Sequence, residues 1–159
     1  MFRVLVLTHG SLADELVSSA RTIAGEAPDV TALSLPWEDS LDEARAKVGA
    51  ALEGLANGDG VLILTDMYGG TPFNVARGFA EPGQVEVVTG VNLPMVVRVT
   101  CKAASEPFED GRETLSEVAL WIQGKGQKSI CLCTESNLRE DGDLEKTSDL
   151  PKTPEVESG

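Results

Sequence analysis

The residue with the clearest capacity for chemistry is His9, the only histidine of the chain. It stands directly after an apolar run rich in Val and Leu and is followed by Gly10. A neutral imidazole nitrogen can attack phosphorus, and the phosphoramidate that forms keeps a high transfer potential. A serine ester would be too stable for this purpose. The residue type therefore suits a group that receives a phosphoryl group and then surrenders it.

An attacking imidazole needs an acceptor that holds the proton on its other ring nitrogen. Asp66 is the candidate, because it follows a second apolar run. Backbone N–H groups that could surround phosphoryl oxygens without adding negative charge occur at Gly10, Gly69 and Gly70 and at the helix start Thr71-Pro72. Taken alone, the same residues also fit a structural histidine and an ordinary Gly-Gly turn.

These residues need a scaffold, and the hydrophobic pattern predicts one. Apolar runs typical of buried strands occur at Phe2–Thr8, Val30–Leu35, Val61–Leu64 and Val85–Thr89, with helical spacing between them. Repeated alternation of strand and helix predicts a doubly wound α/β fold, a mainly parallel sheet with helices on both faces. Ligands bind beyond the carboxyl ends of such strands, so His9, Asp66 and Asn92 should gather at one edge.

Local signals predict where the helices begin and end. Ser11 can cap the first helix, which Gly25 ends, and the segment Ser40–Glu43 has the pattern of a capping box. Thr71 is a good N-cap ahead of a proline at the first helical position.

The pattern changes after Cys101. A helix near Leu115 should end at Gly124–Gly126, and Gln127–Cys133 could form a short, late strand. Residues 134–159 are acidic and nearly free of apolar side chains, which predicts a disordered tail after a domain covering residues 1–133.

Composition limits the possible partners. The chain has 26 acidic and 13 basic residues, a net charge of -13, which argues against binding nucleic acid or anionic lipid. We expect a cytoplasmic protein without membrane insertion, since no apolar run approaches transmembrane length. Cys101, Cys131 and Cys133 are expected to be thiols, and with the one histidine far away in sequence we expect no metal.

Three separated motifs resemble the mannose-family enzyme IIA domain of the bacterial phosphotransferase system. They are Thr8-His9-Gly10, the run from Asp66-Met67-Tyr68-Gly69-Gly70 to Thr71-Pro72-Phe73-Asn74, and Thr89-Gly90-Val91-Asn92-Leu93-Pro94. The resemblance covers about residues 1–133, and the second motif is the specific one. It implies phosphorylation of His9, orientation of its ring by Asp66, and a phosphoryl pocket to which Thr71 and Asn92 belong.

The resemblance also implies a fold and partners. The sheet would have strand order 2-1-3-4, with Gln127–Cys133 as an antiparallel edge strand exchanged within a homodimer. The donor would be the phosphocarrier protein HPr, and the acceptor would be a histidine of an enzyme IIB protein. No cofactor is implied beyond the phosphohistidine itself. No enzyme IIB domain follows in this sequence, so we expect a stand-alone component that serves either sugar transport or regulation.

Other functions remain open at this point. The phosphoryl-donor subunit of a dihydroxyacetone kinase shares this fold and an N-terminal histidine, although the Gly-Gly-Thr-Pro-Phe-Asn loop favours the mannose branch. A regulatory or flavodoxin-like binding module is a further alternative. A histidine phosphatase is disfavoured, because it needs an arginine before the histidine and a second histidine, whereas Thr8 precedes His9 here.

Overall fold

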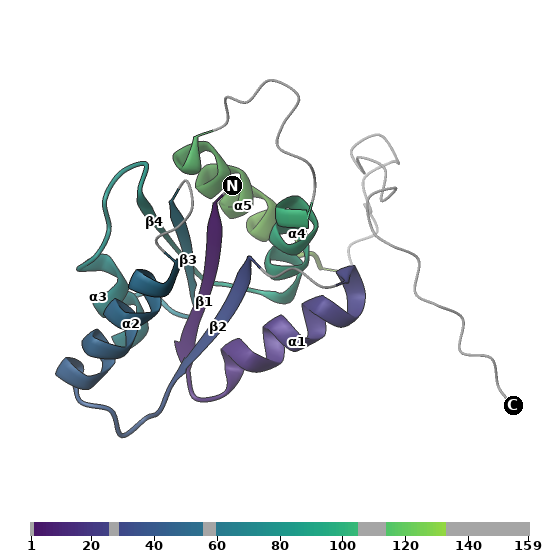
Figure 1. The fold of residues 1–159 in the computed structure, drawn as a ribbon. Coiled ribbons are helices and arrows are strands. Elements are labelled where there is room, and N and C mark those ends of the chain that lie inside the picture. Colours follow the sequence, from purple (N-terminus) through teal and green to yellow (C-terminus); the bar gives the residue numbers. More distant parts are fainter. Residues whose placement is uncertain (1, 26–28, 56–59, 105–113, 133–159) are drawn as a thin grey trace, which may run out of the picture.

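The fold is a four-stranded parallel sheet between two layers of helices (Figure 1). The computed structural model describes residues 2–25, 29–55, 60–104 and 114–132. The strands are β1 (Arg3–His9), β2 (Val30–Leu35), β3 (Val61–Thr65) and β4 (Val85–Thr89), in the order β2-β1-β3-β4. The helices are α1 (Leu12–Ala24), α2 (Leu41–Leu55), α3 (Thr71–Arg77), α4 (Leu93–Ala104) and α5 (Leu115–Lys128). The predicted doubly wound fold and its strand order 2-1-3-4 are confirmed.

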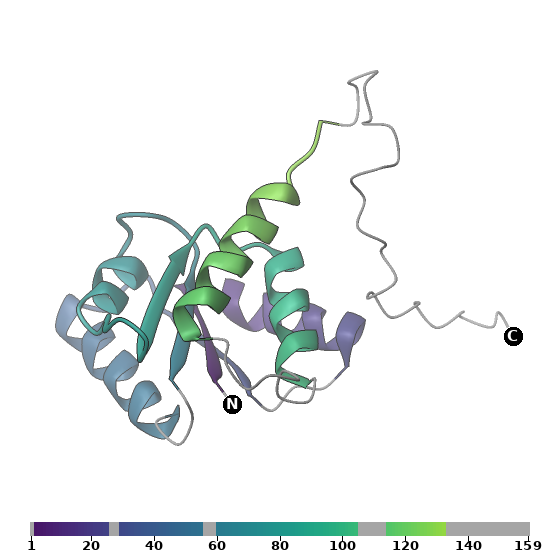
Figure 2. The ribbon, with the colours of Figure 1, turned by 90° about the horizontal axis from the view of Figure 1, so that it is seen from above.

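Alternate residues of the central strand β1 point into two separate hydrophobic cores. Val4 and Val6 belong to the core beneath α1, α4 and α5, whereas Leu5 and Leu7 belong to the core beneath α2 and α3. All four side chains are fully buried, so β1 is apolar on both faces, as a strand covered by helices on both sides must be. Figure 2 shows α4 and α5 side by side on one face of the sheet.

The helix starts agree only in part with the prediction. The capping box at α2 is confirmed: the Glu43 carboxylate accepts the Ser40 backbone N–H at 2.9 Å, and the Ser40 hydroxyl accepts the Glu43 N–H at 3.3 Å. The Ser40 hydroxyl also donates to the Glu43 carboxylate at 2.6 Å, and this bond, together with the one from the Ser40 N–H, holds the pKa of Glu43 below its ordinary value. At α3 the prediction was wrong by one residue, because Gly70 is the N-cap and Thr71 is the first helical residue.

The start of α1 is also capped differently from the prediction. Ser11 occupies the N-cap position but makes no capping hydrogen bond with its side chain. Instead, the hydroxyl of Thr8 accepts the Ala13 N–H at 2.7 Å. Thr8, the second-to-last residue of β1, thus does what a cap side chain would do. At the other end Gly25 follows α1 with a φ of 91°, as predicted for the residue that ends this helix.

The predicted break at Gly124–Gly126 was wrong, since α5 continues to Lys128. Gly126 is buried against α4, and a β-carbon built on it would lie 2.5 Å from the Met95 sulfur. This glycine therefore permits close helix packing rather than ending a helix. Residues 127 and 128, predicted as strand, are helical, and residues 130–132 form no strand in this single chain. Cys133 and the predicted tail, 134–159, lie outside the described residues.

Candidate active site

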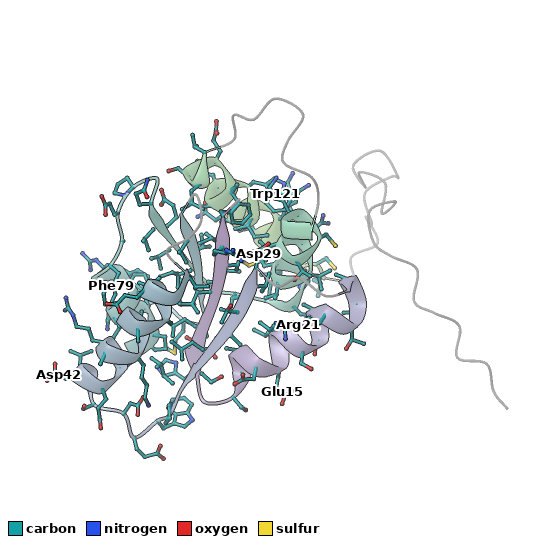
Figure 3. All side chains as sticks on the ribbon, in the orientation of Figure 1. Glu15, Arg21, Asp29, Asp42, Phe79 and Trp121 are labelled. Atoms are coloured by element: carbon teal, nitrogen blue, oxygen red, sulfur yellow. The ribbon has the colours of Figure 1, made fainter. Side chains whose placement is uncertain are left out.

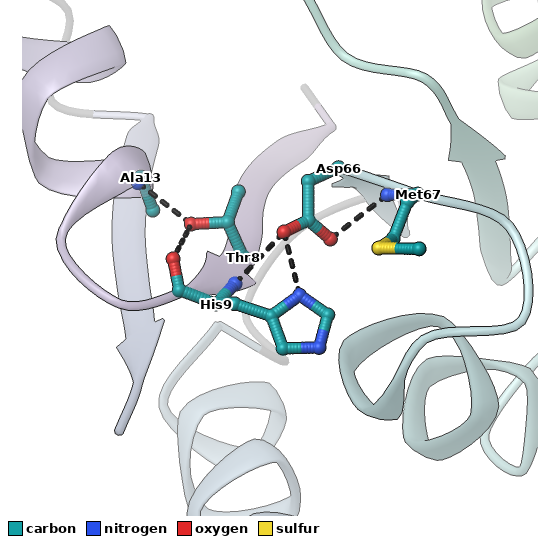
Figure 4. A network of polar contacts seen from close by, with 5 residues as sticks. All are labelled: Thr8, His9, Ala13, Asp66 and Met67. Atoms are coloured by element: carbon teal, nitrogen blue, oxygen red, sulfur yellow. Dashed lines mark hydrogen bonds and ion pairs between the residues drawn. The ribbon is translucent and has the colours of Figure 1, made fainter. Parts of the chain in front are cut away.

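His9 and Asp66 meet at the carboxyl ends of two neighbouring strands. The pairing of Leu7 with Thr65 places the end of β3 beside the end of β1, so Asp66, the residue after β3, comes next to the last residues of β1. The Asp66 Oδ2 atom lies 2.7 Å from Nδ1 of the His9 ring and accepts the His9 backbone N–H at 3.0 Å (Figure 4). The structure therefore brings together the two residues that the sequence predicted as a pair.

The Asp66 carboxylate is held by backbone groups at both oxygens. Its Oδ1 atom accepts the Met67 N–H at 2.9 Å, while Oδ2 takes the two contacts from His9. Burial by itself raises the pKa of Asp66, but the hydrogen bonds from His9 and Met67 outweigh it and hold the pKa below its ordinary value. Asp66 is therefore an ionised acceptor at neutral pH, in a fixed orientation.

This geometry decides which ring nitrogen of His9 can react. A carboxylate only accepts hydrogen bonds, so the neutral imidazole must carry its proton on Nδ1, the nitrogen next to Asp66. The lone pair then resides on Nε2. The His9 side chain is 14 % exposed, which leaves a small part of an otherwise enclosed ring accessible. The arrangement provides a nucleophilic nitrogen, Nε2, while the ring proton is held on Nδ1 at the side of Asp66.

Gly70 forms a wall of the site that no other residue type could form. A β-carbon at this position would lie 2.6 Å from Cε1 of His9 and 3.3 Å from Nε2. The first distance is a severe overlap, so the close approach of the loop to the ring requires glycine. Gly69, immediately before it, has a φ of 80°, which also favours glycine. The Gly-Gly pair thus shapes the loop and brings the start of α3 next to Nε2.

Thr8 fixes the backbone on the other side of His9. It is fully buried; its hydroxyl donates to the His9 carbonyl oxygen at 3.2 Å and accepts the Ala13 N–H (Figure 4). The sequence analysis used Thr8 only as part of a motif. A hydroxyl residue at the end of a buried strand, just ahead of a helix, is the signal that could have identified this role.

Of three further predicted site residues, Gly10 and Asn92 have other contacts in the fold, and Thr71 lies at the start of α3. The Gly10 N–H donates to the Leu35 carbonyl oxygen at 2.8 Å, so it is not the open donor that we expected. Asn92 accepts the Met95 N–H at 3.1 Å and donates to the Gly126 carbonyl oxygen at 3.5 Å, which connects the loop after β4 to α4 and α5. Thr71 is half-buried at the first position of α3.

The sequence analysis missed Trp37. Its indole ring stacks on the His9 imidazole, with ring centroids 4.9 Å apart and planes inclined by 14°. Trp37 follows β2, and β2 is the neighbour of β1 in the sheet, so its loop reaches the same edge. We had considered only the ends of the first, third and fourth strands. The strand order itself was the signal that could have brought the second strand into the site.

Within the described ranges, no helix is long and apolar enough to cross a membrane. The same part of the chain contains no group of three or more His, Cys, Asp or Glu side chains arranged to hold a metal ion.

The strand order and the polar residues at the strand ends place the chain among the doubly wound α/β proteins with a site at the carboxyl edge of the sheet. Residues 3–115 match the family model EIIA-man, described as the PTS system fructose IIA component, where PTS denotes the phosphotransferase system. The chain belongs to this family.

Individual relatives agree with the family match. The PTS system fructose-specific EIIA component of Bacillus subtilis is 32% identical over 136 residues, which are 85% of this chain and 88% of that protein. The PTS system mannose-specific EIIAB component of Escherichia coli is 32% identical over 108 residues, 67% of this chain, and the match spans only 33% of that protein. Among solved structures, the mannose/sorbose specific IIA subunit from Enterococcus faecalis has a TM-score of 0.67 at 33% identity, covering 82% of this chain and 92% of that one.

Proposed function

We propose that this protein is a phosphoryl carrier that accepts a phosphoryl group on Nε2 of His9 from phosphorylated HPr and passes it to an enzyme IIB protein of a sugar phosphotransferase system. The observation that carries the proposal is the 2.7 Å contact between Nδ1 of His9 and Asp66. It assigns the ring proton to Nδ1 and leaves Nε2 as the nucleophile. Membership of the EIIA-man family supports a role in phosphoryl transfer within a phosphotransferase system.

The transfer balances without any additional reactant. The lone pair on Nε2 of His9 forms a new P–N bond as the P–N bond of the donor phosphohistidine breaks, and that electron pair returns to the donor imidazole. The His9 ring gains positive charge during the attack while Nδ1 keeps its proton. The Asp66 carboxylate, hydrogen-bonded to that proton, balances the charge as it develops. The second transfer repeats these steps with the enzyme IIB histidine as the nucleophile.

The phosphoryl oxygens would lie beside the loop at Gly69, Gly70 and Thr71. This placement is supported by Gly70, whose missing side chain would stand 3.3 Å from Nε2. Backbone N–H groups at the start of a helix attract anionic oxygens without requiring a cationic side chain. The Gly10 N–H is already engaged, and Asn92 would have to give up a contact to α4 or α5, so both are weaker candidates than the loop.

Intact-protein mass spectrometry tests the proposal. The wild type and a His9→Ala variant are each mixed with phosphoenolpyruvate, enzyme I and HPr, and matched samples without phosphoenolpyruvate serve as controls. We expect one acid-labile phosphoryl group on the wild type and none on the variant. A wild type that stays unmodified while HPr in the same tube becomes phosphorylated would contradict the proposal, and a dihydroxyacetone kinase partner would be tested next.

We also propose that the chain forms a homodimer through residues after α5. Ile130 and Leu132 are 80% and 63% exposed in the single chain, with Cys131 between them, a spacing that would place both side chains on one face of an extended strand. We expect truncation after Ser129, the C-cap residue of α5, to convert dimers to monomers or aggregates in light scattering. An unchanged dimer mass in the truncated protein would refute this arrangement.

A further inference from the structure

We propose that Trp37 is a positioning residue for His9, and that its indole ring holds the imidazole in the orientation in which Nδ1 faces Asp66. The expected effect on the rate of transfer rests on the proposed function. The expected effect on the orientation of the His9 ring rests on the geometry of the free protein alone. Trp37 is an aromatic residue outside the three motifs that pointed to the family.

The contact itself is a near-parallel stack. The ring centroids of Trp37 and His9 lie 4.9 Å apart, with 14° between the planes. One face of the imidazole is therefore covered by the indole, while Gly70 approaches the ring so closely that a β-carbon on it would lie 2.6 Å from Cε1. An aromatic pair in this geometry is favourable beyond the area that it buries. Together the two contacts leave the imidazole little room to turn.

The loop that carries Trp37 is held at several points. The indole lies over Gly10, and a β-carbon there would stand 3.2 Å from the Trp37 Nε1 atom. In the same loop, the Asp39 N–H donates to the Pro36 carbonyl oxygen at 3.3 Å, and the Asp39 carboxylate pairs with Lys47 of α2 at 2.7 Å. Trp37 is thus presented to His9 by an anchored turn rather than by a loose chain.

Exposure argues for a role in the site rather than in the core. Trp37 is 74% exposed, although a side chain of this size normally stabilises a fold mainly by being buried. Its removal should cost the fold little. The contact with the His9 ring is consequently the main interaction that a truncation of this residue would change.

The orientation of the ring matters because a half-turn of the imidazole would exchange Nδ1 for a carbon atom at Asp66. The 2.7 Å hydrogen bond between Nδ1 and Asp66 would then be lost, and the carboxylate would no longer hold the ring proton on Nδ1. Stacking by Trp37 opposes this turn. The predicted consequence is a slower chemical step, rather than weaker binding of the donor protein.

The experiment compares Trp37→Ala, Trp37→Phe and, as the matched control, Trp121→Phe. Trp121 is the other tryptophan of the chain and lies on α5 with Lys102 of α4 over its ring at 4.6 Å (Figure 3). The phosphorylation of each variant is followed over a range of phospho-HPr concentrations to separate kcat from KM. In parallel, NMR of the free proteins records the Nδ1–H proton of His9 and the ring-current shift of its carbon-bound protons.

We expect Trp37→Ala to lower kcat about 2- to 10-fold, the scale of one aromatic pair, with KM unchanged. Trp37→Phe should restore most of the rate, and Trp121→Phe should behave as the wild type. In the free Trp37→Ala protein, the ring-current shift should disappear and the Nδ1–H signal should broaden by exchange with water, without a matching loss of thermal stability.

Other outcomes overturn the inference. An unchanged kcat for Trp37→Ala would do so, and a raised KM alone would make Trp37 a docking contact instead. If the wild type accepts no phosphoryl group, the proposed function fails, and the NMR comparison still decides the positioning role. An Nδ1–H signal that is equally sharp in Trp37→Ala and in the wild type would then reject it.

Discussion

Substitution of Asp66 by asparagine tests the central contact of the site with little change of shape. The aspartate accepts three hydrogen bonds, two at Oδ2 from His9 and one at Oδ1 from Met67. An asparagine can place its oxygen at only one of these positions, and its amide group then faces a donor. The variant therefore keeps the volume of the side chain while it removes the negative charge and one acceptor position.

The size of the effect follows from the charge that develops on the ring. In the proposed transfer, attack by Nε2 makes the imidazole positive, and the hydrogen bond from Nδ1 at 2.7 Å becomes one between two charged groups. Hydrogen bonds to charged groups contribute about 1.5–3 kcal/mol. At about 1.4 kcal/mol for each factor of ten, Asp66→Asn should slow the transfer roughly 10- to 150-fold.

Rapid-quench measurement of phosphoryl transfer from phospho-HPr checks this value, with circular dichroism and thermal unfolding as controls for the fold. The Gly54→Ala variant is a suitable comparison, because Gly54 lies in α2 and a β-carbon there meets no atom within 4 Å. A folded Asp66→Asn protein that transfers at the wild-type rate would remove Asp66 from the mechanism. A complete loss of transfer would show that its role exceeds the stabilisation of charge.

Three further predictions follow from contacts around the same site. The pKa of Asp66 is lowered in the folded protein, so its carboxylate stabilises the folded state fully above about pH 3.9, the ordinary pKa of aspartate. This contribution is lost as the pH falls through the lower pKa of the folded state. In urea titrations at several pH values, the difference in unfolding free energy between wild type and Asp66→Asn should therefore stay constant down to about pH 4 and shrink below it. Thr8→Val leaves the buried Ala13 N–H without its acceptor and should lower the unfolding free energy by about 1–3 kcal/mol in urea denaturation, so an unchanged midpoint would contradict the contact. Gly70→Ala should displace the His9 ring and slow transfer about 100-fold while the protein stays folded, and a wild-type rate would mean that the loop yields instead of the ring.

The sequence predicted the scaffold well because its strands are strongly patterned. The bounds of β2 and β4 are those expected, β1 is shifted by one residue to Arg3–His9, and β3 extends by one residue at its carboxyl end, to Thr65. Continuous apolar runs with clear breaks leave little choice for a buried parallel strand. The meeting of His9 and Asp66 was predictable as well, because the carboxyl ends of neighbouring parallel strands share one edge.

Contacts between distant segments explain what the sequence did not show. The continuation of α5 past Gly126 depends on close packing against Met95 of α4. The absence of a capping hydrogen bond from Ser11 has a local cause instead, because the Thr8 hydroxyl accepts the N–H of Ala13, five residues further along the chain. At Gly126 a local signal had two readings, and a tertiary contact decided between them. Trp37 belongs to the same class, since its loop meets His9 only after the sheet has formed.

For the proposed function, the way in which the carboxylate is held bears on how one site could both take and give a phosphoryl group. Each oxygen of Asp66 accepts a backbone N–H, so the carboxylate cannot follow the imidazole if the ring moves. The ring must instead meet the carboxylate, and Gly70 and Trp37 limit its movement. The proton on Nδ1 is thus positioned before any partner arrives, and the site needs little rearrangement in either direction of transfer. A carrier that receives from one histidine and donates to another benefits from this arrangement, because the same fixed charge stabilises the ring in both steps.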